Sequence, residues 1–424
     1  MARIETVRYR SHRAEILDEW VDWKPCETDP IIETLPLIFW TDGKPWREVN
    51  LWFFELASDR AIDIKTVNSK ASSLLTYAKW LEENGISWSH FPEKKSERCL
   101  DRYRGALVLM RHESDLAPST VSHKIRVVVQ FYKWLVRRKL FSPQWPMWVS
   151  KTIGISYTDK KGFSRVQEVS STSLAIPNRK RPHERLEDGV WPVSEADREI
   201  ILDCAEQCMP VEISLMLLLG FHTGMRVQTI TDLKVQTLLQ AIPHPLMDHI
   251  YLITVGPGAS PTVATKYDVF GQIEIPKLLL DQLIDYAYST KRILRKIKAK
   301  LDCQDLVFLT KIGNPYARRG FDTSTAINVA MHKLREIGKS KNIIALSSFH
   351  FHQSRATFAT EYAIFAVSTD PQNAISLVMR ALLQKDEVTA LRYIKFAKRV
   401  PIRSASANKF TQRFLGRFYV DHTA

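Results

Sequence analysis

Apolar residues recur three and four positions apart along the first third of the chain, which is the pattern of amphipathic helices. One such helix is predicted to begin after Thr66, a suitable N-cap, and to end at Asn84-Gly85. Its apolar side comprises Ala71, Leu74, Leu75, Ala78 and Leu81. A second helix is predicted from about Glu97 to Arg111. The segment from Asp42 to about Pro146 is therefore expected to be all-helical.

A third predicted helix begins at Pro118-Ser119-Thr120 and has both an apolar and a basic side. The apolar side carries Val121, Ile125, Val128, Phe131, Tyr132 and Leu135. The basic residues are Lys124, Arg126, Lys133, Arg137, Arg138 and Lys139. They fit a solvated helix face and a phosphate-binding surface equally well, and the segment itself does not separate the two.

Two segments lack a clear period. Residues 1–41 mix charges with Trp20, Trp23 and a short apolar run, and are expected to form a partly ordered arm. Residues 149–190 are rich in Ser, Thr, Lys and Arg, and are expected to be a long basic linker. Such a linker fits a nucleic acid backbone or a soluble spacer.

From Trp191 onward the pattern becomes mixed. Ser194 followed by Asp197 predicts a helix start, and Pro210 opens an apolar helix that ends near His222-Thr223-Gly224. IYLITV at 250–255 and ATKYDVFGQIEIP at 264–276 predict a strand and a hairpin arm. DLVFLT at 305–310 predicts another short strand, and residues 278–300 a long basic helix. The fold class expected is mainly α with a small antiparallel β-sheet.

Charge narrows the class of partner. The 424 residues carry a formal net charge of +14, which favours a polyanion such as nucleic acid, with an anionic membrane surface as the second candidate. No apolar run approaches the roughly 20 residues of a membrane span. The charged N-terminus lacks an export signal, so a cytoplasmic, nucleoid-associated protein is expected.

Five scattered cysteines fit a reducing compartment better than a disulfide framework. Cys204 and Cys208 share a helix face, but no second ligand pair follows at metal spacing, so buried helix residues are expected. No metal and no cofactor is expected.

Three places carry candidate chemistry. Arg226 follows a turn after an apolar helix, where a guanidinium can grip a phosphate or pair with a core carboxylate such as Asp232. His352 and Arg355 lie three apart, which suits a site that binds an anion and moves a proton. Tyr393 lies among cations that would favour its phenolate, although a tyrosine on an amphipathic helix is usually a core residue.

Taken together, these residues resemble the tyrosine recombinases, the phage-type integrases. TGMRVQTITDLKV looks like the family's first-arginine box, HQSRATFAT like its His-x-x-Arg box, and LLQKDEVTALRY like its nucleophile box. Lys266 matches the lysine of the family's β-hairpin. LLTYAKWLEENG and STVSHKIRVVVQFYKWL look like its core-binding domain, so the resemblance covers about residues 45–398.

Four positions depart from the family's usual residues. Thr229 stands where an acidic residue is usual, and Ala356 where a second His is common. Gln384 stands where the family has a third His or Trp, and Leu383 where a Gly usually precedes it. Gln384 can donate a hydrogen bond to a phosphate oxygen but cannot carry a proton charge.

The domains expected are an N-terminal arm (1–41), a helical core-binding (SAM-like) domain (42–148), a basic linker (149–190), an α+β catalytic domain (191–398) and a C-terminal tail (399–424). The tail carries an apolar stripe that fits a helix docked on its own core or, as the candidate alternative, a contact with another protomer. The resemblance implies breakage and rejoining of double-stranded DNA, through a 3′-phosphotyrosine, by a homo-tetramer on two sites, with accessory proteins possible. The catalytic set implied is Arg226, Lys266, His352, Arg355, Gln384 and the nucleophile Tyr393.

Two rivals keep the fold and change the activity. One is a type IB topoisomerase-like enzyme, which has the same chemistry without synapsis. The other binds DNA without cutting it, and Gln384, Ala356 and Thr229 are its best support. A membrane-surface protein has only the net charge in its favour.

Overall fold

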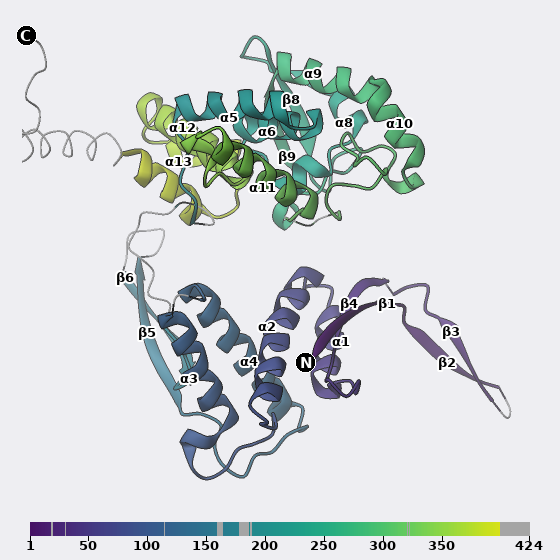
Figure 1. The fold of residues 1–424 in the computed structure, drawn as a ribbon, viewed down its shortest axis with the longest axis vertical. Helices are drawn as coiled ribbons and strands as arrows, with labels where there is room; N and C mark the ends of the chain where they lie inside the picture. Colours follow the sequence, from purple (N-terminus) through teal and green to yellow (C-terminus); the bar gives the residue numbers. More distant parts are fainter. Residues whose placement is uncertain are drawn as a thin grey trace, which may run out of the picture. The chain divides into compact units, whose positions relative to one another are not determined.

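The computed structural model describes residues 1–17, 20–29, 31–113, 115–158, 164–177, 186, 189–319, 321 and 323–398. The chain divides into two compact units, Met1–Pro182 and His183–Ala424, and each is described here by itself (Figure 1). Helices dominate both units, and the strands form small antiparallel sheets. The predicted tail (399–424) and the basic run at 178–185 lie outside the described residues.

The first unit is built on four helices around an aromatic core. The helices are α1 (Arg47–Ser58), α2 (Ile64–Glu83), α3 (Cys99–His112) and α4 (Pro118–Arg137), with a 3₁₀ turn η1 (Lys95–Glu97) before α3. Trp46 is almost fully buried and its ring meets Phe131 edge-on, with the centroids 5.6 Å apart. The apolar side predicted for α4 is buried throughout. Asp63, rather than Thr66, caps α2, because its carboxylate accepts the Lys65 amide.

Three antiparallel hairpin-like pairs complete this unit. The strands are β1 (Arg3–Tyr9), β2 (His12–Leu17), β3 (Trp20–Pro25), β4 (Ile32–Phe39), β5 (Ser150–Thr158) and β6 (Ser164–Thr172). β1 pairs with β4, which packs on α1 and α2, so most of the expected arm belongs to the helical body. β2 pairs with β3 and reaches away from the helices of its unit (Figure 1).

β5 and β6 occupy residues that were expected to be an irregular linker. They pair in continuous register from Ser150↔Thr172 to Thr158↔Ser164. Their Val, Ile, Tyr and Thr residues favour strands, and the surrounding Ser, Lys and Arg hid that preference in the composition.

The second unit surrounds a three-stranded sheet with helices. The sheet has the order β7 (Ile242–Pro243), β8 (Ile250–Val255), β9 (Gly271–Pro276), all antiparallel. The helices are α5 (Glu195–Cys208), α6 (Val211–Thr223), α7 (Val227–Thr231), α8 (Val235–Leu239), α9 (Lys277–Tyr288), α10 (Thr290–Lys298), α11 (Thr325–Ser340), α12 (His352–Thr369), α13 (Ala374–Ala381) and a last helix over 387–398, with 3₁₀ turns η3 (Lys266–Asp268), η4 (Leu301–Cys303) and η5 (Ile344–Leu346).

The predicted start of α5 is confirmed, since Ser194 Oγ accepts the Asp197 amide. β8 is the predicted strand, and β9 forms the later part of the predicted hairpin arm. Two other predictions are wrong. Residues 278–300 are not one helix. Ser289 has an extended backbone and is the N-cap of a second helix, α10, because its side chain accepts a hydrogen bond from the Arg292 amide. Residues 305–310 form only isolated bridges, Lys234↔Leu306 and Leu309↔Pro315, and no strand.

Candidate active site

α6, the sheet and α12 position three cations around one small cavity. Arg226 precedes α7, Lys266 begins the 3₁₀ turn η3 between β8 and β9, and Arg355 lies in the first turn of α12. All three line the same cavity, together with backbone and side chains of Thr223, Gly224, Met225, Thr229, Thr265, Ile273, Ala381, Leu382 and Leu383. Arg226 and Lys266 are 40 positions apart in the sequence, and Lys266 and Arg355 are 89 apart, yet all three line one cavity.

Gly224 sets the turn that delivers Arg226. It ends α6 in the left-handed conformation, with φ of 63°, which a glycine adopts without strain. A Cβ there would lie 2.4 Å from Cδ1 of Phe358 and 2.9 Å from Cδ2 of Leu382. The turn therefore allows both a positive φ and a close approach of α12 and the residues after α13.

Arg355 holds the walls of the cavity together. Its side chain is 2% exposed, and its guanidinium donates to the carbonyls of Gly224 and of Leu382, the latter at 3.2 Å. These carbonyls belong to the end of α6 and the end of α13. Because Arg keeps its charge at any physiological pH, the cavity contains a permanently buried cation.

Lys266 lies on a strained turn. Tyr267 and Asp268, which follow it, have φ of 61° and 49°. The Lys266 ammonium lies 5.6 Å from the centre of the Tyr267 ring, a cation–π distance. Such strain is typical of functional sites.

Among described residues, Asp232 binds Lys234 at 2.6 Å, accepts the Ala264 amide and lies 3.6 Å from Arg319.

The segment after α13 joins the arginine wall to the lysine turn. Leu382 accepts from Arg355, and Lys385 donates to the Tyr267 carbonyl at 2.8 Å. Between them, Leu383 has a left-handed backbone, with φ of 48°. A Cβ atom added to Gly271 of β9 would lie only 2.5 Å from Cδ2 of Leu383. Leu383 thus packs against the bare backbone of Gly271. Apart from the unusual Leu at this position, nothing in the sequence indicated this contact.

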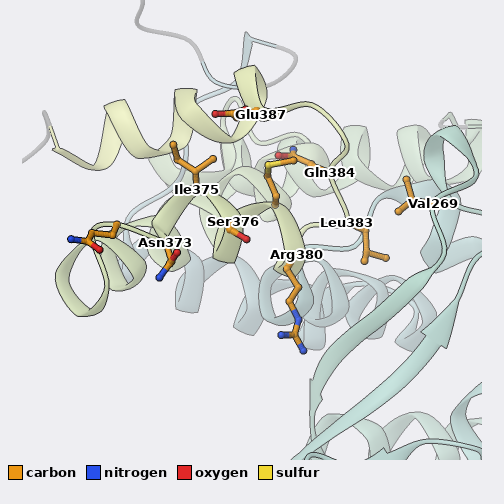
Figure 2. A pocket seen from close by; sticks show the side chains of 10 residues that line it. Val269, Asn373, Ile375, Ser376, Arg380, Leu383, Gln384 and Glu387 are labelled. Carbon is orange, nitrogen blue, oxygen red and sulfur yellow. The ribbon is translucent and has the colours of Figure 1, made fainter. Parts of the chain in front are cut away.

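Gln384 is buried, but it lines a second, larger cavity rather than the cavity of the three cations. This second cavity, of about 590 Å³, lies along α13 (Figure 2). Figure 2 shows Leu383 and Val269 on its side nearest the sheet, with Asn373 at the opposite end. Leu383 lines both cavities, so the two cavities adjoin at this residue.

Tyr393 lies inside the protein. It is 0% exposed and belongs to an apolar cluster of α12, α13 and the last helix that includes Ala356, Leu382 and Ala390. Ala356 follows Arg355 directly, so the small residue found where a second His is common helps to enclose Tyr393. His352 begins α12 and is half-buried, one turn before Arg355. Neither residue lines the cavity of the three cations.

A basic groove lies on the first unit between α2 and α4. It measures about 370 Å³ and is lined by Lys65, Thr66, Ser69, Lys70, His123, Arg126, Val127 and Gln130. Burial lowers the pKa of Lys70, whose ammonium lies 5.2 Å from the centre of the Trp52 ring. Part of the basic side of α4 therefore faces a groove with a second set of cations.

In the part of the chain that the structure describes, no group of three or more His, Cys, Asp or Glu could hold a metal ion. Within the same residues, no helix is long and apolar enough to cross a membrane.

The chain is similar in structure to solved integrases and recombinases. It resembles the Tn1549 transposon integrase (residues 82–397) bound to circular intermediate DNA, with 12% identity, coverage of 82% of this chain and 94% of that one, and a TM-score of 0.48. It resembles XerA recombinase with 16% identity, coverage of 85% of this chain and 96% of that one, and a TM-score of 0.34. It resembles a lambda integrase tetramer bound to a Holliday junction with 13% identity, coverage of 82% of this chain and 75% of that one, and a TM-score of 0.44.

These solved proteins are tyrosine recombinases, the family that the sequence motifs resemble. No family model and no curated protein matches the chain. At these identities and TM-scores the likeness does not carry a function to this chain, so the site residues must do so.

Proposed function

We propose that this protein is a site-specific DNA recombinase or integrase of the tyrosine class, serving a mobile element. The observation that carries the proposal is that Arg226, Lys266 and Arg355 line one cavity. Two guanidinium groups and one ammonium form a site for a single phosphate, and their order in the chain is that of the recombinase motifs.

The proposed reaction starts with the scissile phosphate between Arg226 and Arg355. Their charge offsets the extra negative charge of the pentavalent transition state. The Tyr393 hydroxyl attacks phosphorus, its proton passes to His352, and the bond to the 5′ oxygen breaks. Lys266 gives that oxygen a proton, which leaves a 3′-phosphotyrosine and a free 5′-hydroxyl. Gln384 binds a non-bridging oxygen.

Rejoining reverses these steps with a different strand. A 5′-hydroxyl from a second duplex attacks the phosphotyrosine and releases Tyr393, so the number of phosphodiester bonds is conserved and no ATP is needed. We infer that the active assembly is a homo-tetramer on two double-stranded DNA sites. The basic groove between α2 and α4 would hold phosphates of the same duplex.

The burial of Tyr393 gives the proposal a further condition. Its side chain is fully buried within an apolar cluster, so the proposed attack needs Tyr393 to become accessible to DNA. We propose that the last helix, 387–398, shifts before attack, and that DNA binding or assembly supplies the free energy for that shift.

The test is covalent capture of DNA. A binding site is first selected from a randomised duplex pool, and a nicked version of it is incubated with the protein. The nick lets the 5′-hydroxyl fragment diffuse away, so the wild-type chain is expected to accumulate a protein–DNA adduct on denaturing gels, and Tyr393→Phe to form none.

Tyr362→Phe is the matched control, because Tyr362 lies on α12 of the same unit and loses the same hydroxyl. It should form the adduct at close to the wild-type rate. A wild-type chain that binds the selected duplex without any adduct would support the binding-only alternative, whose best support in the sequence is Gln384, Ala356 and Thr229.

A further inference from the structure

The β2–β3 hairpin has one apolar face that is open to solvent. Strand alternation places Ala14 and Ile16 of β2 beside their partners Trp23 and Val21 of β3. Ile16 is 83% exposed, Trp23 64% and Val21 47%. Clustered exposed apolar residues on a projecting hairpin are unusual in a protein that stays alone in solution, and they mark a contact surface.

The same hairpin is acidic within a basic protein. Residues 12–29 contain six acidic residues and two basic ones, whereas the whole chain has a net charge of +14. Both basic residues, Arg13 and Lys24, pair with Glu15, at 2.9 and 2.5 Å. A duplex would repel this segment, so the surface that it fits is apolar and basic.

α10 presents such a surface on the second unit. Its arginines point inward: Arg295 binds Glu212 at 2.8 Å, and Arg292 donates to the Leu306 carbonyl at 2.7 Å. Its apolar residues point outward, with Ile293, Leu294 and Ile297 exposed by 42, 56 and 71%. Exposed Lys291, Lys296, Lys298 and Lys300 surround them.

This arrangement reverses the usual helix pattern, in which apolar residues face the core. The arginines fix the helix through Glu212 and backbone carbonyls, so the apolar side is not needed for folding. Ile293, Leu294 and Ile297 lie at one-turn spacing on one side, which is the pattern of a helix that binds a partner.

We propose that the β2–β3 hairpin of one copy docks on α10 of a second copy. The apolar residues Ile16, Val21 and Trp23 would cover Ile293, Leu294 and Ile297, and the net negative charge of residues 12–29 would favour approach to the lysines around α10. The contact joins two different surfaces, so it is head-to-tail and can repeat around a ring. It does not depend on strand cleavage.

The contact is small. A two-stranded hairpin on three turns of helix buries less than the roughly 1,200 Å² of a standard interface, so two copies alone associate weakly. Copies that are held together by a common polyanion gain the contact at high effective concentration.

Photo-crosslinking between isotopically distinct copies tests the proposal. One preparation of the full chain contains ¹⁴N and carries a benzophenone amino acid in place of Trp23. It is mixed, over a series of protein concentrations, with a second preparation that contains ¹⁵N and lacks the probe. After irradiation and digestion, mass spectrometry is expected to find ¹⁴N hairpin peptides joined to ¹⁵N peptides from residues 290–301. Joining only to ¹⁴N peptides would mean docking within one copy, and would overturn the proposal.

Substitutions provide a second readout by sedimentation equilibrium of the chain without DNA. Trp23→Asp and Ile297→Asp should each weaken self-association about tenfold or more, because each removes a central apolar anchor. Leu109→Asp and Ile344→Asp are matched controls, since Leu109 is 62% and Ile344 83% exposed in the same two units. Equal effects in both pairs would overturn the proposal.

Charge reversal separates a specific pair from general stickiness. Glu27→Lys, in the exposed segment after β3, and Lys296→Glu should each weaken the association, and a chain that carries both changes should regain part of it. Additive losses in the double variant would contradict the pairing of these two surfaces.

Discussion

Gly224 is a single residue on which two sides of the cation cavity depend. Its positive φ ends α6, its missing Cβ leaves space for Phe358 and Leu382, and its carbonyl accepts from Arg355. The position therefore combines a backbone requirement with a steric one. Those two requirements can be separated by comparison with another glycine.

Gly224→Ala should lower the free energy of unfolding of the second unit by roughly 1–2 kcal/mol for the left-handed backbone and a further 1–3 kcal/mol for the clash. Denaturant titration measures the loss. Gly85→Ala is the control, because Gly85 has φ of 61° and no heavy atom within 4 Å of the Cβ position. It should show only the first loss in its own unit, and equal losses would rule out a steric role for Gly224.

Gln384→His introduces the residue that the recombinases usually have at this position. We expect strand cleavage to stay the same or to rise, because the imidazole can donate to a phosphate oxygen and also hold a proton. The rate of adduct formation on the nicked duplex measures the effect. A total loss of cleavage would show that the amide of Gln384 has a separate role in its own cavity.

The sequence motifs grouped six residues into one proposed site, and three of them, Arg226, Lys266 and Arg355, line one cavity. A core position was one of the two readings for Tyr393, since an amphipathic helix usually buries its tyrosine. The cavity that Gln384 lines was not predictable, because side-chain packing after α13 decides it. Leu383 shows why: its left-handed backbone and its packing on Gly271 connect residues 112 positions apart.

At the scale of elements, the short segment after α13 acts as a clip between α12 and the β8–β9 turn. The Leu382 carbonyl accepts a hydrogen bond from Arg355, and the Lys385 ammonium donates one to the Tyr267 carbonyl. Between them, Leu383 packs on Gly271. The position of Lys266 relative to the arginines therefore depends on residues at the start of the LLQKDEVTALRY segment, ahead of Tyr393.

Gly271→Ala should disturb this clip, since its Cβ would lie 2.5 Å from Cδ2 of Leu383. We expect adduct formation to slow by about tenfold or more, given the sensitivity of catalysis to small displacements. The double variant Gly271→Ala/Leu383→Gly removes the clash and the left-handed leucine together, and should recover part of the rate. Losses that simply add would argue against direct coupling of the two positions.

Periodicity predicted the long helices of the first unit well and the short elements poorly. The apolar sides of α2 and α4 were correct because burial follows a strict helical period there. Ser289 divides the helix expected over 278–300, because a serine side chain can cap a new helix inside a continuous basic pattern. β5 and β6 were missed because charged and hydroxyl residues interrupt their β-branched ones.

At the scale of the whole molecule, the excess charge and the groove between α2 and α4 predict that the proposed binding to DNA depends strongly on salt. Each phosphate contact adds about 0.9 to the slope of log binding constant against log salt concentration for a duplex.

Arg126→Ala should weaken binding to duplexes of any sequence and lower that slope by about 1, because Arg126 lines the groove. Fluorescence anisotropy over a salt series measures both quantities. Arg102→Ala is the matched control: Arg102 is exposed on α3 and does not line the groove, so its slope should stay at the wild-type value. Equal slopes for both variants would exclude the groove from the DNA contact.

The enclosed position of Tyr393 also bears on the safety of the cell that makes the protein. If Tyr393 cleaves DNA as proposed, every chance encounter of so basic a chain with the chromosome would be an opportunity for an unwanted nick. The burial of Tyr393 in the cluster that includes Ala356 would then protect the chromosome during such encounters. A variant that loosened this cluster, such as Ala390→Gly, would test the idea through the level of DNA-damage signalling in cells that express it.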